Sequence, residues 1–277
     1  MRIPGDRTMT PGKPTPYGPT PEELASFDTN GYLVLEEFLD SDHVARLTRS
    51  LDKAVQRRRH GHENNQPHHG QTLVDGDNIR ILHILADDPL FQELLDHPAI
   101  MSYVQAILSE QAHFHASDAF WETEPKASGP GWHIDGFGGG YRPFRPGIPL
   151  LQLKIGYFLS DMTRPGQGNL TVVPKSHRLN EDLTEEQRQS FDFPESVQVC
   201  VPSGTCILFH NALWHTRGAF TRAGGRRIML YYAYELPWML ANPEHWSYPK
   251  EFYAGLTPEQ RQLFHGFVFD PPEDRWY

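Results

Sequence analysis

The chain has 277 residues, of which 38% are hydrophobic, 12% aromatic and 22% charged, which excludes a disordered chain and suits one large domain or two small ones. Lys and Arg total 25 against 35 Asp and Glu, so the net charge of -10 disfavours nucleic acid as a partner. The sequence has no apolar run long enough for a membrane helix, no apolar signal segment and only two cysteines, so we expect a cytoplasmic protein with no membrane segment, disulfide framework or thiolate zinc site.

The first part of the chain is predicted to be mainly helical. Residues 1–20 are rich in proline, glycine and threonine, which indicates a flexible arm outside the core. Thr20 and the acidic residues after it are typical of a helix start, and residues 31–35 are typical of a short strand. Helices are predicted over 41–58, where apolar residues recur at helical spacing, and over 89–109. The histidine-rich run between them, residues 57–71, contains Gly, Asn and Pro, which favours a solvated loop over a metal site.

Short strands separated by Gly and Pro dominate from residue 112 onward. They are expected over 112–120, 150–159, 170–174, 197–201, 205–210 and 228–234, a pattern that favours a barrel or sandwich. The aromatic tail at 237–277 is expected to pack over the barrel or a partner subunit. We therefore expect one domain over 21–277, with a helical part at 21–110, a barrel at 111–236 and a C-terminal extension, and a homodimer formed through that extension is a further hypothesis.

Three residues form a candidate metal site. His133 and Asp135 are two apart, so on a strand they point to the same face and can bind one ion together. His-x-Asp is common by chance and needs a third ligand, which His215 can supply. Two histidines and one carboxylate form the facial triad of non-haem Fe(II) oxygenases. An arginine after the distal histidine would pair with the far carboxylate of 2-oxoglutarate through two parallel hydrogen bonds.

With these residues in place, the sequence resembles the phytanoyl-CoA dioxygenase (PhyH) family of Fe(II)/2-oxoglutarate-dependent oxygenases. The resemblance spans most of residues 20–236 and is carried by four segments in order: 27–39, 133–135, 159–177 and 215–226. It implies a mainly β fold, a double-stranded β-helix or jelly-roll barrel with N-terminal helices packed on one side. It also implies that Fe(II), 2-oxoglutarate and O2 are used to oxidise a small molecule, with release of succinate and CO2. Hydroxylation is the default outcome, and demethylation, desaturation and ring formation, which use the same triad, are the alternatives.

The resemblance assigns roles to individual residues. His133, Asp135 and His215 would bind iron, and the family's eleven-residue spacing selects Arg226 over Arg227 as the cosubstrate anchor, with Arg227 pointing to the other face. Lys154 stands where relatives place a polar residue that contacts 2-oxoglutarate, and a surface lysine is the alternative. The retained Asp135 argues against halogenation, since related halogenases lack this carboxylate.

The sequence departs from the family pattern near the distal histidine. Arg217 stands where many relatives have a small hydroxyl residue, and Phe220 and Arg222 replace the usual Asn and Ser, so cosubstrate contacts are expected to be rearranged. The expected substrate-contacting residues are His115, Phe137, Arg142 and Arg217. His115 could equally be a core polar residue, and Arg142 a solvated loop charge.

Two other classes of protein remain as alternatives. A non-catalytic or differently metallated cupin-like binding protein would not need Arg226, and a zinc hydrolase would work without oxygen. An arginine eleven residues after His215 argues against both, because neither needs a carboxylate anchor there.

Overall fold

The computed structural model describes residues 18–64, 70–125, 129–135, 148–179, 182–221, 225–239 and 248–264. Most of the predicted N-terminal arm lies outside these residues. Two antiparallel sheets form the centre of the molecule. The larger has seven strands in the order β1-β8-β5-β10-β4-β3-β2, and the smaller has three in the order β7-β6-β9. The mainly β, jelly-roll fold expected from the sequence is confirmed.

The strands follow the chain with few long interruptions. Their bounds are β1 (Tyr32–Leu35), β2 (Thr72–Asp75), β3 (Asn78–Leu82), β4 (His113–Glu122), β5 (Gln152–Phe158), β6 (Leu170–Val172), β7 (Val197–Val199), β8 (Cys206–His210), β9 (His215–Arg217) and β10 (Arg227–Glu235). Each of the six strands predicted after residue 111 is present within a few residues of its expected bounds. The hairpin of β2 and β3 and the short strand β9 were not predicted.

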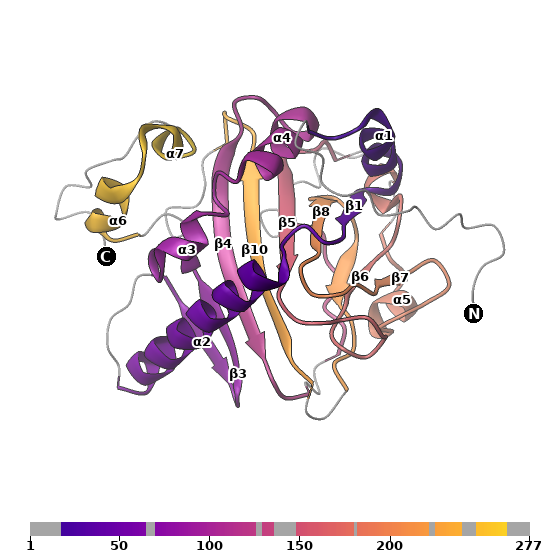
Figure 1. Cartoon of the computed structure of the whole chain (residues 1–277). Coiled ribbons are helices and arrows are strands. Elements are labelled where there is room, and N and C mark those ends of the chain that lie inside the picture. Colours follow the sequence, from indigo (N-terminus) through magenta and orange to yellow (C-terminus); the bar gives the residue numbers. More distant parts are fainter. Residues whose placement is uncertain are drawn as a thin grey trace.

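Helices cover one face of the larger sheet, and α2 (Ser41–Glu63) crosses in front of it diagonally (Figure 1). The others are α1 (Pro21–Asn30), α3 (Pro89–Gln92), α4 (Pro98–Ile107), α5 (Glu185–Gln189), α6 (Lys250–Gly255) and α7 (Pro258–Gln262), with 3-10 turns at Ile84–Ala86 and Ser176–Arg178. The α1 helix begins as predicted, with a capping box between Thr20 and Glu23.

Two predicted helix boundaries were wrong. The predicted helix over 89–109 is two helices, because Pro98 has no backbone N–H and disfavours helical angles at His97, whose ψ is 120°. The α2 helix also runs past the predicted end at residue 58 to Glu63 and takes in part of the histidine-rich run. Contacts on both sides of the predicted end hold this part of the helix. The buried Arg58 guanidinium donates two hydrogen bonds to Asp87 at 3.0 and 2.7 Å, and Arg59 donates to the carbonyls of Gly76 and Asp77 at 3.2 and 2.9 Å.

The core has two main parts. One lies between the larger sheet and the helices and includes Leu47, Leu51, Phe91 and Tyr232, and the other lies between the two sheets and includes Phe158, Leu170 and Phe209. The described part of the C-terminal extension packs on β4: the Phe114 and Phe264 rings lie 5.4 Å apart, and the N–H of Phe114 donates to the carbonyl of Leu263 at 2.7 Å.

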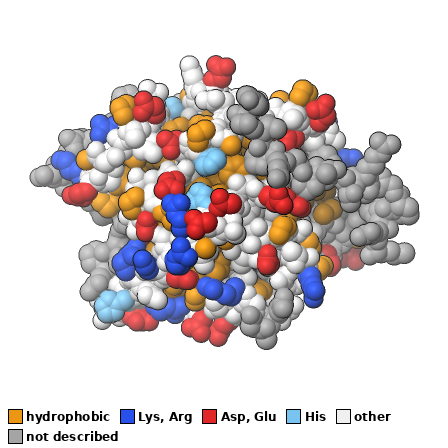
Figure 2. Space-filling view, viewed as in Figure 1, with side chains coloured by type: hydrophobic (Ala, Val, Ile, Leu, Met, Phe, Trp, Pro, Cys, Tyr) orange, Lys and Arg blue, Asp and Glu red, His pale blue; other side chains and the backbone are white. Residues whose placement is uncertain are grey.

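The face of the molecule that α2 crosses carries both positive and negative side chains. Figure 2 shows Lys and Arg side chains lying among Asp and Glu side chains on the face that α2 crosses, with no continuous basic area among the coloured residues. None of the helices in the described segments is long and apolar enough to cross a membrane.

Candidate functional site

The site lies where the chain before β5 meets β9. His133 forms an isolated antiparallel bridge with His215, with both backbone N–H···O distances at 3.0 Å. Two residues further on, the N–H of Asp135 donates to the carbonyl of Asn211 at 2.7 Å. These backbone bonds bring together two segments that are eighty residues apart in the sequence, and they fix the three expected ligands next to one another.

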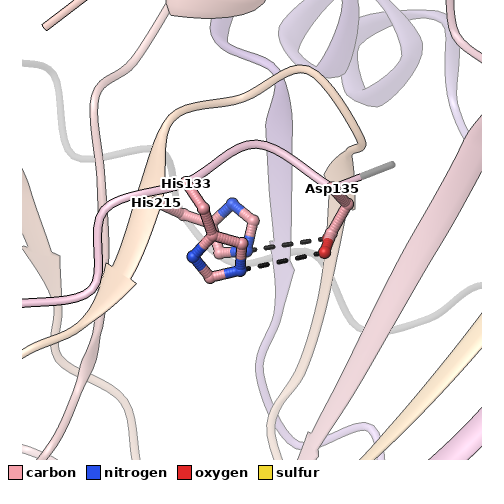
Figure 3. Close-up of side chains that lie close together, drawn as sticks. All are labelled: His133, Asp135 and His215. Carbon is pink, nitrogen blue, oxygen red and sulfur yellow. Dashed lines mark ion pairs between the residues drawn. The ribbon is translucent and has the colours of Figure 1, made fainter. Parts of the chain in front are cut away.

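The three side chains converge on one point. Their ligand atoms all lie within 4.8 Å of one another, with His133 Nε2 3.8 Å and His215 Nε2 3.6 Å from the two oxygens of Asp135. Figure 3 shows the two imidazole rings side by side with these nitrogens turned toward the carboxylate. The structure therefore brings together all three residues that the sequence singled out.

Backbone carbonyls orient both rings. Nδ1 of His133 lies 2.6 Å from the carbonyl of Gly131, and Nδ1 of His215 lies 2.8 Å from the carbonyl of Leu213. A carbonyl only accepts, so Nδ1 of each ring carries the proton and donates it. Each Nε2 then keeps its lone pair toward Asp135, which is the arrangement that histidine ligands of metals adopt.

The charge state of the cluster also fits a divalent cation. Burial, with a smaller contribution from His133, lowers the pKa of His215 to about 4, so its ring is neutral near pH 7. Burial alone would raise the pKa of Asp135, but Lys154 and then the two neighbouring histidines outweigh it and lower that pKa. A neutral imidazole and an ionised carboxylate are the forms that bind metal.

The cluster opens into a cavity of about 450 Å³ between the two sheets. Its lining includes Lys154, whose Nζ lies 3.9 Å from Asp135, and Tyr231 of β10. Apolar walls come from Phe120, Leu170 and Phe209. This mixture of apolar walls and a few convergent polar groups is typical of small-molecule sites.

The two neighbouring arginines lie on opposite sides of the sheet, as strand alternation requires. Arg227 lines the cavity and is 3% exposed, with its Nε donating to the carbonyl of Gly168 at 2.7 Å and its Nη1 to Glu122 at 2.8 Å. Arg226 lies outside the cavity, 3.2 Å from Asp52 of α2. The structure differs from the expected orientation of this pair: Arg227 lies four residues before Tyr231 on the same face of β10 and lines the cavity with it, whereas Arg226 points toward α2.

The expected substrate contacts have different outcomes. Arg217 lines the cavity from β9. His115 is not among the cavity residues: it is buried, and its Nδ1 lies 2.7 Å from Glu235, so it occupies a polar network beneath the site. Burial, followed by the charge of Lys154, lowers its pKa to about 3. Phe137 and Arg142 lie outside the described residues.

Sequence reasoning missed two other features of the cavity. Glu122 is a buried carboxylate at the end of β4, and Arg80 of β3 lies 2.5 Å from Asp118 at the hairpin side. The alternation of Ala116, Asp118, Phe120 and Glu122 along β4 is the signal that could have found Glu122, because side chains two apart share a face.

The fold and the two-histidine, one-carboxylate cluster define the class of Fe(II)/2-oxoglutarate-dependent oxygenases. Within this class, the sequence model of the phytanoyl-CoA dioxygenase (PhyH) family matches residues 27–228, and the chain belongs to this family. Iron and 2-oxoglutarate are accordingly its metal and cosubstrate.

Individual relatives are distant. The uncharacterized protein Rv1501 of Mycobacterium tuberculosis is 27% identical over 201 residues, which cover 71% of this chain and 68% of that protein. Ectoine dioxygenase of Sphingopyxis alaskensis is 24% identical over 237 residues, with 70% and 68% covered.

Solved structures share the fold. The structure of HygX from Streptomyces hygroscopicus with nickel, 2-oxoglutarate and hygromycin B bound has a TM-score of 0.62 at 22% identity, covering 79% of this chain and 88% of that one. The carbocyclase SnoK from nogalamycin biosynthesis has a TM-score of 0.58 at 19% identity, covering 81% of this chain and 87% of that one.

Proposed function

We propose that this oxygenase hydroxylates a small-molecule substrate and releases succinate and CO2, using iron held by His133, Asp135 and His215. The convergence of these three side chains at the wall of a cavity carries the proposal. Iron with 2-oxoglutarate and O2 supplies the oxidation of a C–H bond. The chain's own residues hold the metal on one face, bind the cosubstrate and keep water away from the reacting atoms.

We assign the distal carboxylate of 2-oxoglutarate to Arg227 in place of Arg226. Arg227 is buried and faces the cavity on the same face of β10 as Tyr231, whereas the Arg226 guanidinium is 47% exposed and paired with Asp52. A planar guanidinium binds a carboxylate through two parallel hydrogen bonds, and burial strengthens them. Lys154 supports the same site from β5, next to Asp135.

The assignment of Arg227 is tested by binding, without a known substrate. The 2-oxoglutarate dissociation constant is measured for the iron-loaded protein under anaerobic conditions through the visible absorption of the chelated 2-oxoacid. Arg227→Gln should raise it at least tenfold, and Arg226→Gln should leave it within twofold of the parent. The reverse result would return the anchor role to Arg226.

Hydroxylation is tested by the product. Succinate release across a panel of small molecules identifies substrates, and the mass of each product then separates the outcomes. A gain of one oxygen atom supports hydroxylation, whereas a loss of two hydrogens would show desaturation or ring formation and overturn it. The cavity volume of about 450 Å³ lies within the range of roughly 300–1,000 Å³ that is usual for small-molecule sites, so we expect a small molecule rather than a macromolecule as the substrate.

A further inference from the structure

The arginine assigned to the cosubstrate already has a protein carboxylate beside it. Glu122 and Arg227 are 4% and 3% exposed, lie 2.8 Å apart and both line the cavity. Taking an ion pair out of water is costly, and a cosubstrate anchor needs no internal acid to bind a carboxylate. The position of Glu122 therefore calls for a function.

A second guanidinium faces the same pair. Arg217 of β9 lines the cavity two residues after His215. In the register of β6 and β9, Arg217 lies opposite Leu170, two residues after Gly168, whose carbonyl accepts from Nε of Arg227. Arg217 therefore lines the cavity beside the pair, and we call these three residues the charge cluster.

The charge cluster has a net charge of +1. Two guanidiniums contribute +2, and Glu122 contributes -1. This total matches the single negative charge of the distal carboxylate of 2-oxoglutarate. With Glu122 neutral, two like charges would remain beside each other, and with Arg217 neutral the charge cluster would have no net charge to attract a carboxylate.

We propose that Glu122 and Arg217 are positioning residues that set the charge of the pocket around Arg227, so that it receives a group carrying one negative charge. This proposal rests on the proposed function of the site. Glu122 also fixes the direction of the Arg227 guanidinium, because it binds Nη1 while the carbonyl of Gly168 binds Nε.

The test is a set of charge variants in the full-length, iron-loaded protein. Glu122→Gln removes the negative charge but keeps an oxygen that can accept from Arg227, and Arg217→Gln removes one positive charge. The double variant restores a net charge of +1. Arg226→Gln is the matched control, because it removes the same charge outside the cavity.

The probes are 2-oxoglutarate and 2-oxobutyrate, which lacks the distal carboxylate, titrated anaerobically through the visible absorption band. For 2-oxoglutarate we expect Glu122→Gln to bind about tenfold more tightly and Arg217→Gln about tenfold more weakly, since one unit charge changes in a buried pocket. The double variant should return to within about threefold of the parent. Binding of 2-oxobutyrate should stay within twofold throughout.

Several results would overturn the proposal. If both single variants bind 2-oxoglutarate more weakly and the double variant is no better, the residues support the fold alone. If the variants weaken the binding of 2-oxobutyrate as much as that of 2-oxoglutarate, they disturb the metal site rather than the pocket for the distal carboxylate. A parent protein that binds neither 2-oxoacid contradicts the proposed function itself, whereas normal parent binding with unchanged variants contradicts only the role of the charge cluster.

Discussion

Gly168→Ala probes the position of Arg227 without changing any charge. Gly168 has a φ of 75°, and a Cβ built on it would lie 2.5 Å from Cδ of Arg227. Real atoms do not approach so closely, so Arg227 must move. Its guanidinium is held at Nε by the carbonyl of Gly168 itself and at Nη1 by Glu122, so this movement breaks or lengthens those bonds.

The cost has two physical sources. An alanine in the left-handed region costs roughly 1–2 kcal/mol, and weakening a hydrogen bond to a charged group costs roughly 1.5–3 kcal/mol. We therefore expect Gly168→Ala to lower the free energy of unfolding by about 2.5–5 kcal/mol in urea titrations. Displacement of the anchor should also raise the dissociation constant of 2-oxoglutarate at least tenfold.

Gly166→Ala separates the two effects. Gly166 has a φ of 83°, and its added Cβ would meet only Thr221 Oγ1 at 3.0 Å, so it carries the backbone strain without touching Arg227. It should destabilise the protein by about 1–2 kcal/mol and leave 2-oxoglutarate binding unchanged. If Gly168→Ala binds 2-oxoglutarate as tightly as Gly166→Ala does, Arg227 is not the residue that binds the distal carboxylate.

Three further perturbations test the fold around the site. Arg226→Ala removes an exposed pair with Asp52 and should change the free energy of unfolding by less than about 1 kcal/mol; a larger loss by urea titration would show that this contact docks α2. Asp87→Asn leaves the buried Arg58 without its ionised partner and should cost about 3–5 kcal/mol, so a loss below 1 kcal/mol contradicts the structure. Burial, followed by His177, lowers the pKa of His210 to about 3 against 6.5 when unfolded, so stability should fall as the pH drops from about 6.5 toward 3. His210→Gln should reduce that slope by up to one proton, about 1.4 kcal/mol per pH unit, and an unchanged slope in acid titrations of stability would exclude His210 as its source.

Local patterns in the sequence predicted the barrel well, because its strands are short apolar runs separated by Gly and Pro. The hairpin of β2 and β3 was missed because its strands have only four and five residues and the run Asp75–Asn78 between their apolar parts is polar. The short strand β9 was missed because its three residues are defined by pairing with β6 and by the bridge to His133, and neither contact is local.

The site was predicted where the chemistry fixes the spacing of residues. A His-x-Asp pair and a distal histidine follow from what a metal needs, and the structure brings those side chains together. The choice between Arg226 and Arg227 depends on the exact alignment of β10 with the cavity. Successive side chains point to opposite faces of the sheet, so a shift of one residue exchanges the two arginines. Glu122 was missed because a lone glutamate in a strand shows its importance only when β10 places Arg227 opposite it.

We propose that His133, Asp135 and His215 hold iron together with 2-oxoglutarate. Anaerobic addition of Fe(II) and 2-oxoglutarate to the metal-free protein, with visible absorption recorded and Asp135→Ala alongside, tests this site. We expect a charge-transfer band in the parent that is absent in Asp135→Ala at equal protein concentration. A folded parent that shows no band, or an Asp135→Ala variant that shows the full band, would exclude these three residues as the iron site.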